Sequence, residues 1–262
     1  MKTIKTATIE INYEDEGPAD APVIVFSNSL GSNLGMWQQQ AEQFRKDYRV
    51  VRYDHRGHGQ SEVPEGPYIF AELSNDVVAL MDALEIAQAH FVGLSMGGMT
   101  AMGLALAHPQ RLLSITACNC VAAFGPEALA VWDERIAAIT ANGLAPLVEG
   151  TLQRWFTQPT IDARPDEMAA VREMILATPV AGYLACCEAI KHLNYIDRIY
   201  TIGVPTLFIA GTHDLGTPAS AMRDMHARVS GSRYVELDAA HLSNIERPAE
   251  FERALKDFLS SI

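Results

Sequence analysis

The sequence lacks any run approaching the roughly 18 consecutive apolar residues that a membrane-spanning helix requires. Its opening segment, residues 1–6, also lacks the apolar stretch of a secretory signal peptide. Cysteine is scarce, and the four thiols occur without CxxC spacing, which excludes a dense disulfide framework. We therefore expect a cytoplasmic protein that has no membrane partner and keeps its cysteines reduced and mostly buried.

Positive charge is also in short supply, because 20 Lys and Arg residues face 32 Asp and Glu residues and the net charge is −12. This charge opposes attraction to nucleic acid phosphates or anionic lipid, so no nucleic-acid partner is expected. Hydrophobic residues make up 48% of the chain, which is ordinary for a folded protein. A length of 262 residues suits one large sheet with one inserted subdomain.

What the chain does contain is an alternation of strand and helix patterns. Segments rich in β-branched and aromatic residues predict strands at residues 23–26, 48–53, 90–92, 112–117, 206–210 and 232–237. Helical patterns predict helices at residues 36–44, 70–84, 97–107, 219–229 and 248–259. This order favours the α/β class, with a mostly parallel sheet and helices on both faces. Residues 8–13 alternate ahead of a Gly17-Pro18 turn, which predicts a hairpin entering the strand at 23–26.

The strand pattern stops between about residues 122 and 195. This segment is rich in Ala and other helix formers, with Pro and Gly as punctuation, and it contains no convincing strand. We interpret residues 122–195 as an inserted helical cap, and residues 1–121 and 196–262 as the α/β core.

The strongest chemical signal is a GxSxG sequence, Gly93-Leu94-Ser95-Met96-Gly97, with strand character before it and helix character after it. Alone, such a sequence is as easily a tight structural turn. In this context it predicts a sharp strand-to-helix turn that presents Ser95 Oγ at the sheet edge as a nucleophile. The small glycines are needed so that the turn does not clash with neighbouring segments.

A serine nucleophile needs a base, and the base needs a third group that fixes its tautomer. Asp214 follows the predicted strand at 206–210, and His241 follows the one at 232–237. Each alone is an ordinary loop residue, but the order Ser, Asp, His suits a nucleophile on a strand-to-helix turn. We therefore predict Ser95, Asp214 and His241 as a catalytic triad. Six of the seven other histidines are weighed for the base role: His55, His58, His90, His108, His192 and His213. His90 and His108 lie at element boundaries, which favours packing or capping, and His55 and His58 either shape the pocket rim or pack beneath it, with the structural role favoured.

Acyl transfer also needs two hydrogen-bond donors for the oxyanion that develops on the attacked carbonyl. The backbone N–H of Met96, directly after the nucleophile, is the first candidate. The second is the N–H of Leu30, in the loop at residues 27–33 that follows the first core strand.

These segments together resemble the α/β-hydrolase superfamily over nearly the full length. The resemblance lies in Asn28-Ser29-Leu30-Gly31, Asp54-His55-Arg56-Gly57-His58-Gly59-Gln60-Ser61, the GxSxG segment, Gly211-Thr212-His213-Asp214 and Ala240-His241. It implies an eight-stranded, mainly parallel sheet and a lid over the active site. Many relatives carry His-Gly where this chain has Asn28-Ser29. That departure, with Arg154-Trp155-Phe156-Thr157 and the residues from His241 to Pro248, is similar to 3-oxoadipate enol-lactonases.

The resemblance implies hydrolysis of the enol-lactone of 3-oxoadipate in the β-ketoadipate pathway of aromatic-compound catabolism, without metal or organic cofactor. The free carboxylate of that small-molecule lactone needs a cationic or amide-rich partner. Arg154 is the candidate, although it also fits a surface or cap-anchoring arginine stacked on Trp155. Trp132, Trp155 and Phe156 are candidates for the cap side of the substrate pocket, or for its hydrophobic core.

Three alternatives to this function remain open on the same residues. A carboxylesterase or a C–C-bond hydrolase would use the same triad on another substrate, and a cofactor-free haloperoxidase would use it for perhydrolysis. A noncatalytic ligand-binding protein is the third alternative, but it would not need all three triad residues.

Overall fold

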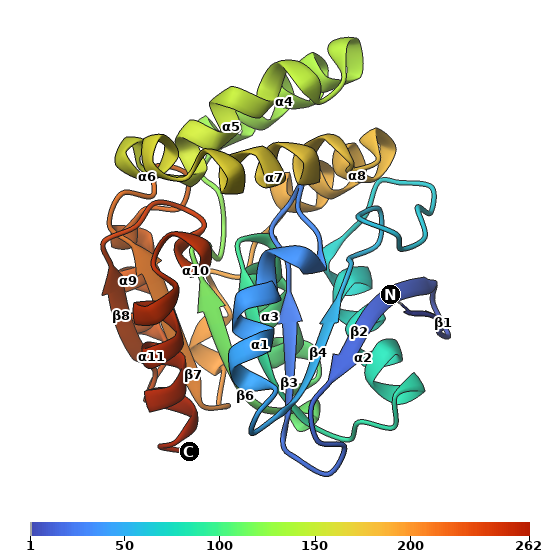
Figure 1. Ribbon diagram of the computed structural model, residues 1–262, viewed down its shortest axis with the longest axis vertical. Helices are drawn as coiled ribbons and strands as arrows, with labels where there is room; N and C mark the ends of the chain where they lie inside the picture. Colours follow the sequence, from blue (N-terminus) through green and yellow to red (C-terminus); the bar gives the residue numbers. More distant parts are fainter. Residues whose placement is uncertain (1) are drawn as a thin grey trace.

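The computed structural model describes residues 2–262, and an eight-stranded sheet runs through its centre (Figure 1). The strands are β1 (Lys2–Lys5), β2 (Glu10–Glu16), β3 (Val23–Ser27), β4 (Arg49–Tyr53), β5 (Ala89–Leu94), β6 (Leu112–Cys118), β7 (Thr206–Gly211) and β8 (Arg233–Leu237). Their order is β1-β2-β4-β3-β5-β6-β7-β8. β1–β2 and β2–β4 pair antiparallel, and every other neighbouring pair is parallel. The expectation of an eight-stranded, mostly parallel sheet is therefore confirmed.

The predicted hairpin between residues 8–13 and the first core strand is wrong. β2 pairs with β1 and β4, while β4 lies between β2 and β3. The other neighbour of β3 is β5, so β3 lies between two parallel strands. This position suits its buried apolar residues. β1 carries no apolar alternation and is mostly exposed, which explains why no sequence pattern marked it.

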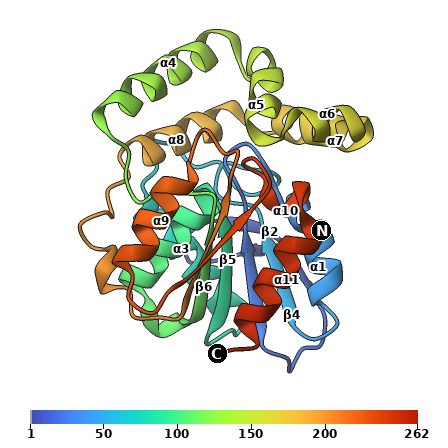
Figure 2. The same cartoon turned by 90° about the vertical axis from the view of Figure 1, so that its left-hand side faces the viewer.

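The α-helices of the core lie on both faces of the sheet. They are α1 (Gln38–Phe44), α2 (Phe70–Ala83), α3 (Met96–Ala107), α9 (Ala219–Arg228), α10 (Ser243–Glu246) and α11 (Pro248–Leu259). Figure 2 shows α1 and α11 on one face of the sheet and α3 and α9 on the other. The five predicted core helices are confirmed to within two residues, the largest difference being that a 3-10 turn replaces the start of the first.

Successive residues of one strand enter two separate hydrophobic clusters, one on each face of the sheet. In β3, Val25 packs with the cluster that includes α2 and α3, whereas Ile24 and Phe26 pack with the cluster that includes α1 and α11. This follows from the two-residue period of a strand. All four cysteines are free and buried, as expected.

Residues 122–195 form a layer of helices above the sheet, on the side toward which the arrowheads of β3 and β6 point (Figure 1). The helices are α4 (Pro126–Asn142), α5 (Val148–Trp155), α6 (Gln158–Ala163), α7 (Pro165–Leu176) and α8 (Val180–Lys191). The segment leaves and re-enters the core at one place, because Ala123 and Asn194 form an isolated bridge. α4 buries only Ile139 and lies farthest from the sheet (Figure 2).

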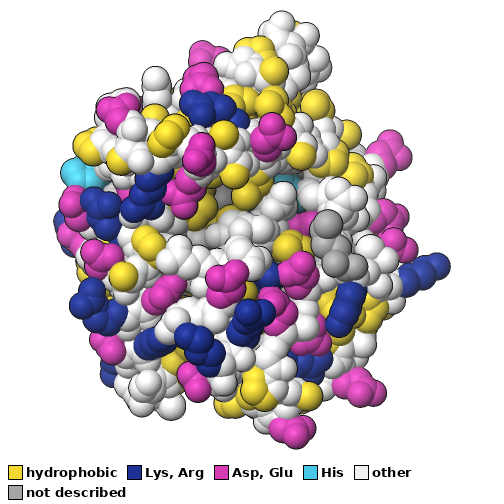
Figure 3. Space-filling model, in the orientation of Figure 1, with side chains coloured by type: hydrophobic (Ala, Val, Ile, Leu, Met, Phe, Trp, Pro, Cys, Tyr) yellow, Lys and Arg dark blue, Asp and Glu magenta, His cyan; other side chains and the backbone are white. Residues whose placement is uncertain are grey.

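Acidic and basic side chains are interspersed over the core on the face shown in Figure 3, and hydrophobic side chains gather along the helical layer above. Within residues 2–262, no single helix has the length and apolar character of a membrane span. α7 and α8 meet these two criteria only when they are taken together, and the pair is bent by 89°.

Candidate active site

Ser95 occupies a strained turn between β5 and α3. Its φ is +57°, a left-handed conformation that non-glycine residues adopt rarely and usually at functional sites. A Cβ on Gly93 would lie 2.0 Å from the carbonyl oxygen of Gly97, and one on Gly97 would lie 2.2 Å from that of Ser27. The turn thus requires glycine at both positions, as the sequence predicts, and it places Ser95 in the pocket wall.

The loop that follows β3 is fixed directly against this turn. The Gly97 N–H donates to the Asn28 carbonyl at 3.0 Å, and the Gly31 N–H donates to His58 Nε2 at 3.0 Å. In contrast, the N–H groups of Leu30 and Met96 have no acceptor anywhere in residues 2–262. Two free donors beside a nucleophile, one of them at the N-terminus of α3, suit the stabilisation of an oxyanion.

His55 and His58 lie beneath this loop, fully buried, in the structural roles expected of them. His55 Nε2 hydrogen bonds Ser27 Oγ at 2.9 Å, so the two histidines hold the loop at both ends. Burial lowers the pKa of His55 to about 3 and that of His58 to about 4. Both imidazoles are therefore neutral at ordinary pH, which leaves His58 Nε2 free to accept the hydrogen bond from Gly31.

Asp214 and His241 come from the loops after β7 and β8, and they meet in a hydrogen bond of 2.7 Å from His241 Nδ1 to Asp214 Oδ2. Thr217 supports the carboxylate through its hydroxyl, at 2.6 Å, and its N–H, at 3.0 Å. Burial would raise the pKa of Asp214, but the nearby His241 and these hydrogen bonds outweigh it and hold the pKa at about 2. An ionised Asp214 fixes the proton on His241 Nδ1 and leaves Nε2 able to accept a proton.

Ser95 and His241 line the same pocket. Within the described chain no hydrogen bond joins Ser95 Oγ to the imidazole; such contacts are often long without substrate and shorten when it binds. His241 is the only histidine among residues 2–262 that lines this pocket.

Asn119 is a member of the site that the sequence reasoning missed. It directly follows β6, is completely buried and has a positive φ of 46°. Its Nδ2 donates to Asp214 Oδ2 at 3.0 Å and to the Ala240 carbonyl at 3.2 Å, while its Oδ1 accepts from Ser243 Oγ at 2.6 Å. A polar residue at a strand end was the available signal, the same one that marked Ser95, Asp214 and His241.

The pocket between core and helical layer contains about 580 Å³ of space that no atom fills, part of it open to solvent. The core contributes the lining residues Ser29, Leu30, Ser95, Met99, Asp214, Gly216, Thr217 and His241. The helical layer and its entry contribute Phe124, Trp132, Arg135, Arg154, Trp155 and Ile190. Of the four candidates for substrate contacts, Arg154, Trp132 and Trp155 are thus in the wall, whereas Phe156 is buried in the hydrophobic core.

Two arginines face the pocket without an acidic partner. Arg154 donates to Thr151 Oγ1 at 3.1 Å, and Arg135 donates to the Tyr183 hydroxyl. Arg135 also lies over the rings of Trp132 and Tyr183, at 5.4 and 5.5 Å, so the predicted stacking of an arginine on an aromatic involves this residue and not Arg154.

Neither arginine forms an ion pair with any residue from 2 to 262, and the buried Nε of Arg135 has no acceptor there. Partial burial and the charge of Arg135 lower the pKa of Arg154 below its ordinary value. No motif marks Arg135, which is why sequence reasoning missed it. The side of the pocket that the helical layer forms thus carries two positive charges that an anionic ligand can neutralise.

Comparison with known proteins gives a consistent result. The sequence profile of the alpha/beta hydrolase fold family matches residues 22–248. Two curated relatives from Acinetobacter baylyi, 3-oxoadipate enol-lactonases 1 and 2, are 42% and 38% identical over 98% and 97% of this chain and 94% of their own lengths. The crystal structure of the enol-lactonase from Burkholderia xenovorans LB400 superposes with a TM-score of 0.95, at 42% identity, covering 99% of this chain and all of that one. The match extends through core and helical layer alike, and the chain belongs to the α/β-hydrolase fold family.

Proposed function

We propose that this protein hydrolyses the enol-lactone of 3-oxoadipate through a serine acyl-enzyme, within aromatic-compound catabolism. The observation that carries the proposal is the pairing of Ser95, Asp214 and His241 with two unpaired arginines across one small pocket. The enol-lactone carries an ester bond, on which the catalytic residues can act, and a free carboxylate, which the arginines can bind. Relatives named as 3-oxoadipate enol-lactonases, at about 40% identity over the full chain, support the same substrate.

In the acylation step, Ser95 Oγ attacks the lactone carbonyl carbon while His241 Nε2 takes the hydroxyl proton. The carbonyl oxygen becomes an oxyanion held by the N–H groups of Leu30 and Met96. Collapse of this intermediate breaks the ring C–O bond and expels the enolate oxygen, which receives the proton from His241. The enol then tautomerises to the ketone, and the opened chain stays esterified to Ser95.

Deacylation repeats these events with water as the nucleophile. His241 removes a proton from water, which attacks the ester carbonyl; the bond between the acyl carbon and Ser95 Oγ then breaks, and His241 passes the proton to Ser95 Oγ. The product is 3-oxoadipate with a second carboxylate. We assign recognition of the first carboxylate to Arg154 and Arg135, and the walls around it to Trp132 and Trp155. Residues 122–195 would thus act as the cap that selects the substrate.

The test is a steady-state comparison of 3-oxoadipate enol-lactone with a neutral aryl ester, using Ser95→Ala as the blank. We expect a much higher kcat/KM for the lactone, and loss of both activities in the variant. Lactone opening no faster than aryl ester hydrolysis would replace the proposal with a general carboxylesterase. Failure of a serine-directed phosphonate to label Ser95 would indicate a ligand-binding protein instead.

A further inference from the structure

Glu246 is a buried carboxylate that plays no part in the proposed reaction and does not line the pocket. It ends the short helix α10, five residues after His241, and its side chain is completely shielded from solvent. No Lys, Arg or His within residues 2–262 forms an ion pair with it. Arg164 does approach, but it donates to the backbone carbonyls of Ile245 and Glu246 and not to the carboxylate. A buried charge without a counterion is costly unless hydrogen bonds replace its hydration.

The hydrogen bonds to this carboxylate come from two different parts of the molecule. Oε2 accepts from the Ala240 N–H at 2.7 Å, directly beside His241. Oε1 accepts from Thr160 Oγ1 at 2.6 Å, from the Thr157 N–H at 3.0 Å and from the Thr157 hydroxyl. One oxygen therefore holds the loop of the base, and the other holds the start of α6 in the helical layer.

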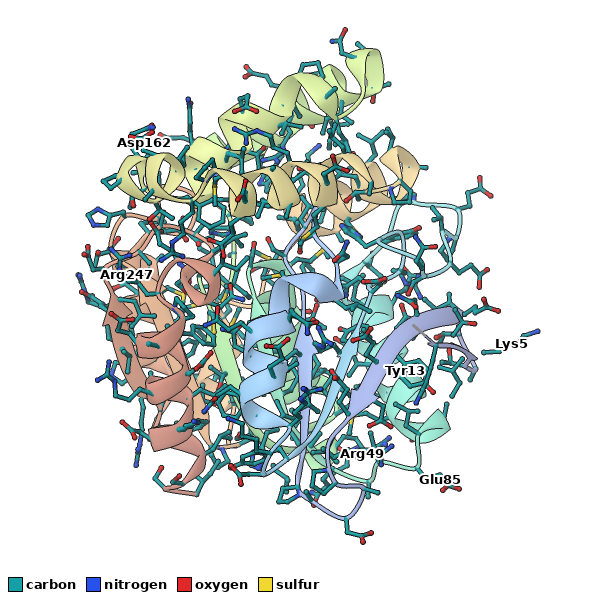
Figure 4. The ribbon with its side chains drawn as sticks, viewed as in Figure 1. Lys5, Tyr13, Arg49, Glu85, Asp162 and Arg247 are labelled. Atoms are coloured by element: carbon teal, nitrogen blue, oxygen red, sulfur yellow. The ribbon has the colours of Figure 1, made fainter. Side chains whose placement is uncertain are left out.

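A second contact joins the same two segments on the other side of the base. The Leu242 N–H donates to the Trp155 carbonyl at 3.1 Å. Both neighbours of His241 are thus tied to the segment at residues 155–160, through Glu246 on one side and directly on the other. Trp155 and Arg154, at the start of that segment, line the substrate pocket. Figure 4 shows the proximity of the two parts: Asp162 of α6 lies above Arg247, which follows Glu246.

Burial of Glu246 would raise its pKa, but the bonds from Thr157, Thr160 and the Ala240 N–H outweigh this effect and hold the pKa below its ordinary value. The side chain is therefore a carboxylate, with two acceptor oxygens and no donor. This matters because the groups on each side include a backbone N–H, which can only donate.

We propose that Glu246 is a positioning residue that fixes the catalytic base and the substrate-lining end of the cap as one unit. The proposal rests on the proposed acyl transfer by Ser95 and His241. It assigns the carboxylate two effects: placement of His241 relative to Ser95, which governs kcat, and placement of Arg154 and Trp155, which governs KM for a carboxylate-bearing substrate.

Glu246→Gln is the principal test because it preserves size and removes one acceptor. Whichever way the amide turns, its NH₂ faces the N–H of Ala240 or that of Thr157, so one side of the bridge is lost. Misplacing a catalytic group by about 1 Å costs about 10²-fold in rate. We expect a loss of this order in kcat for an aryl ester, an equal slowing of Ser95 labelling by a phosphonate, and a raised KM for the lactone.

Asp76→Asn is the matched control. Asp76 is also a buried carboxylate, but it pairs with Arg56 and touches neither the His241 loop nor α6. Both variants should lower Tm, and only Glu246→Gln should lower kcat when assayed well below Tm. A Glu246→Gln protein that keeps its kcat and labelling rate while losing as much Tm as Asp76→Asn would overturn the proposal.

Two further variants keep the test decisive if Glu246→Gln does not fold. Glu246→Asp retains the charge but is one methylene too short to reach both sides, so its kcat should also fall; an unchanged kcat would contradict the proposal. Thr160→Val removes a donor only on the cap side and should raise KM more than it lowers kcat. Because ester hydrolysis and phosphonate labelling do not involve the lactone, failure of the lactone assay alone would count against the proposed function and leave this inference standing.

Discussion

The two walls of the pocket differ in how their charged groups are paired. The core wall consists of the lining residues from the α/β core, and the cap wall consists of those from residues 122–195, the proposed cap. On the core wall, the Asp214 carboxylate accepts hydrogen bonds from His241, Thr217, Gly216 and Asn119. On the cap wall, Arg135 and Arg154 each hydrogen bond one neutral hydroxyl and meet no carboxylate among the residues described. The Asp214 carboxylate of the core wall therefore has its hydrogen-bond partners before a substrate arrives, whereas the two guanidinium groups of the cap wall have no counterion among these residues.

This difference separates chemistry from selection. Dipoles and charges that are already oriented need no rearrangement during acyl transfer, so the core wall serves any ester that reaches Ser95. An unpaired guanidinium is stabilised by any anion that binds to it, so the cap wall should bind a substrate with a carboxylate more tightly than a neutral one. We therefore expect core substitutions to affect all substrates equally and cap substitutions to discriminate between them.

The largest effect should come from Ser95→Ala. Removing the nucleophile of a serine hydrolase costs about 10⁶-fold in kcat. We expect the loss to be of this order for the enol-lactone and for a neutral aryl ester alike, measured by steady-state kinetics with correction for the uncatalysed rate. A variant that kept the activity of either substrate would show that the core wall does not act through Ser95.

Asp214→Asn should follow, with a loss of about 10⁴-fold in kcat. The amide no longer fixes the tautomer of His241, although Thr217 and Asn119 still hold the side chain in place. Because the pKa of Asp214 is about 2, the wild-type carboxylate remains ionised down to pH 4. The loss should therefore be the same for lactone and ester at every pH from 5 to 8. A loss confined to one substrate would contradict the separation of the two walls.

The sheet, and the meeting of Ser95, Asp214 and His241 in one pocket, were predictable because each of these residues follows a strand, and the ends of parallel strands meet at one edge of a sheet. Asn119 obeys the same rule, but nothing in its local sequence marks it as a partner of Asp214. Arg135 was out of reach for another reason: the sequence of α4 does not show which side of this helix faces the pocket, and only the packing of α4 against α8 turns Arg135 toward it. The predicted hairpin between β2 and β3 is wrong because β4, which comes later in the chain, lies between them in the sheet.

The cap wall is tested by Arg154→Gln and Arg135→Gln, measured separately. Each removes a charge-assisted hydrogen bond to the substrate carboxylate, which is worth about 1.5–3 kcal/mol, or about 10- to 100-fold in kcat/KM. The loss should appear with the lactone and be nearly absent with a neutral aryl ester. Equal losses for both substrates would mean that these arginines support the fold of the cap and do not select the carboxylate.

Asn119→Ala should have a smaller effect on the core wall, about tenfold in kcat, because Asp214 retains its other donors. The loss should again be equal for lactone and ester, in contrast to the arginine variants. Asn119→Asp is a useful partner variant, since it keeps the shape but places a second carboxylate against Asp214 and should be worse than the alanine. An alanine variant with unchanged kcat would show that Asn119 only fills space.

The smallest effect concerns stability, and it distinguishes the walls without any substrate. The pKa of the buried His58 is about 4, below the value of 6.5 for a solvated histidine, so the unfolded chain binds a proton that the folded chain excludes between these pH values. The free energy of unfolding should therefore fall as pH is lowered from 6.5 to 4, by close to 1 kcal/mol per pH unit from this residue. His58→Gln should remove that part of the slope in denaturant titrations. Arg154→Gln, on the cap wall, should leave the slope intact; if it flattened the slope as well, the acid sensitivity would not belong to the histidine under the oxyanion loop.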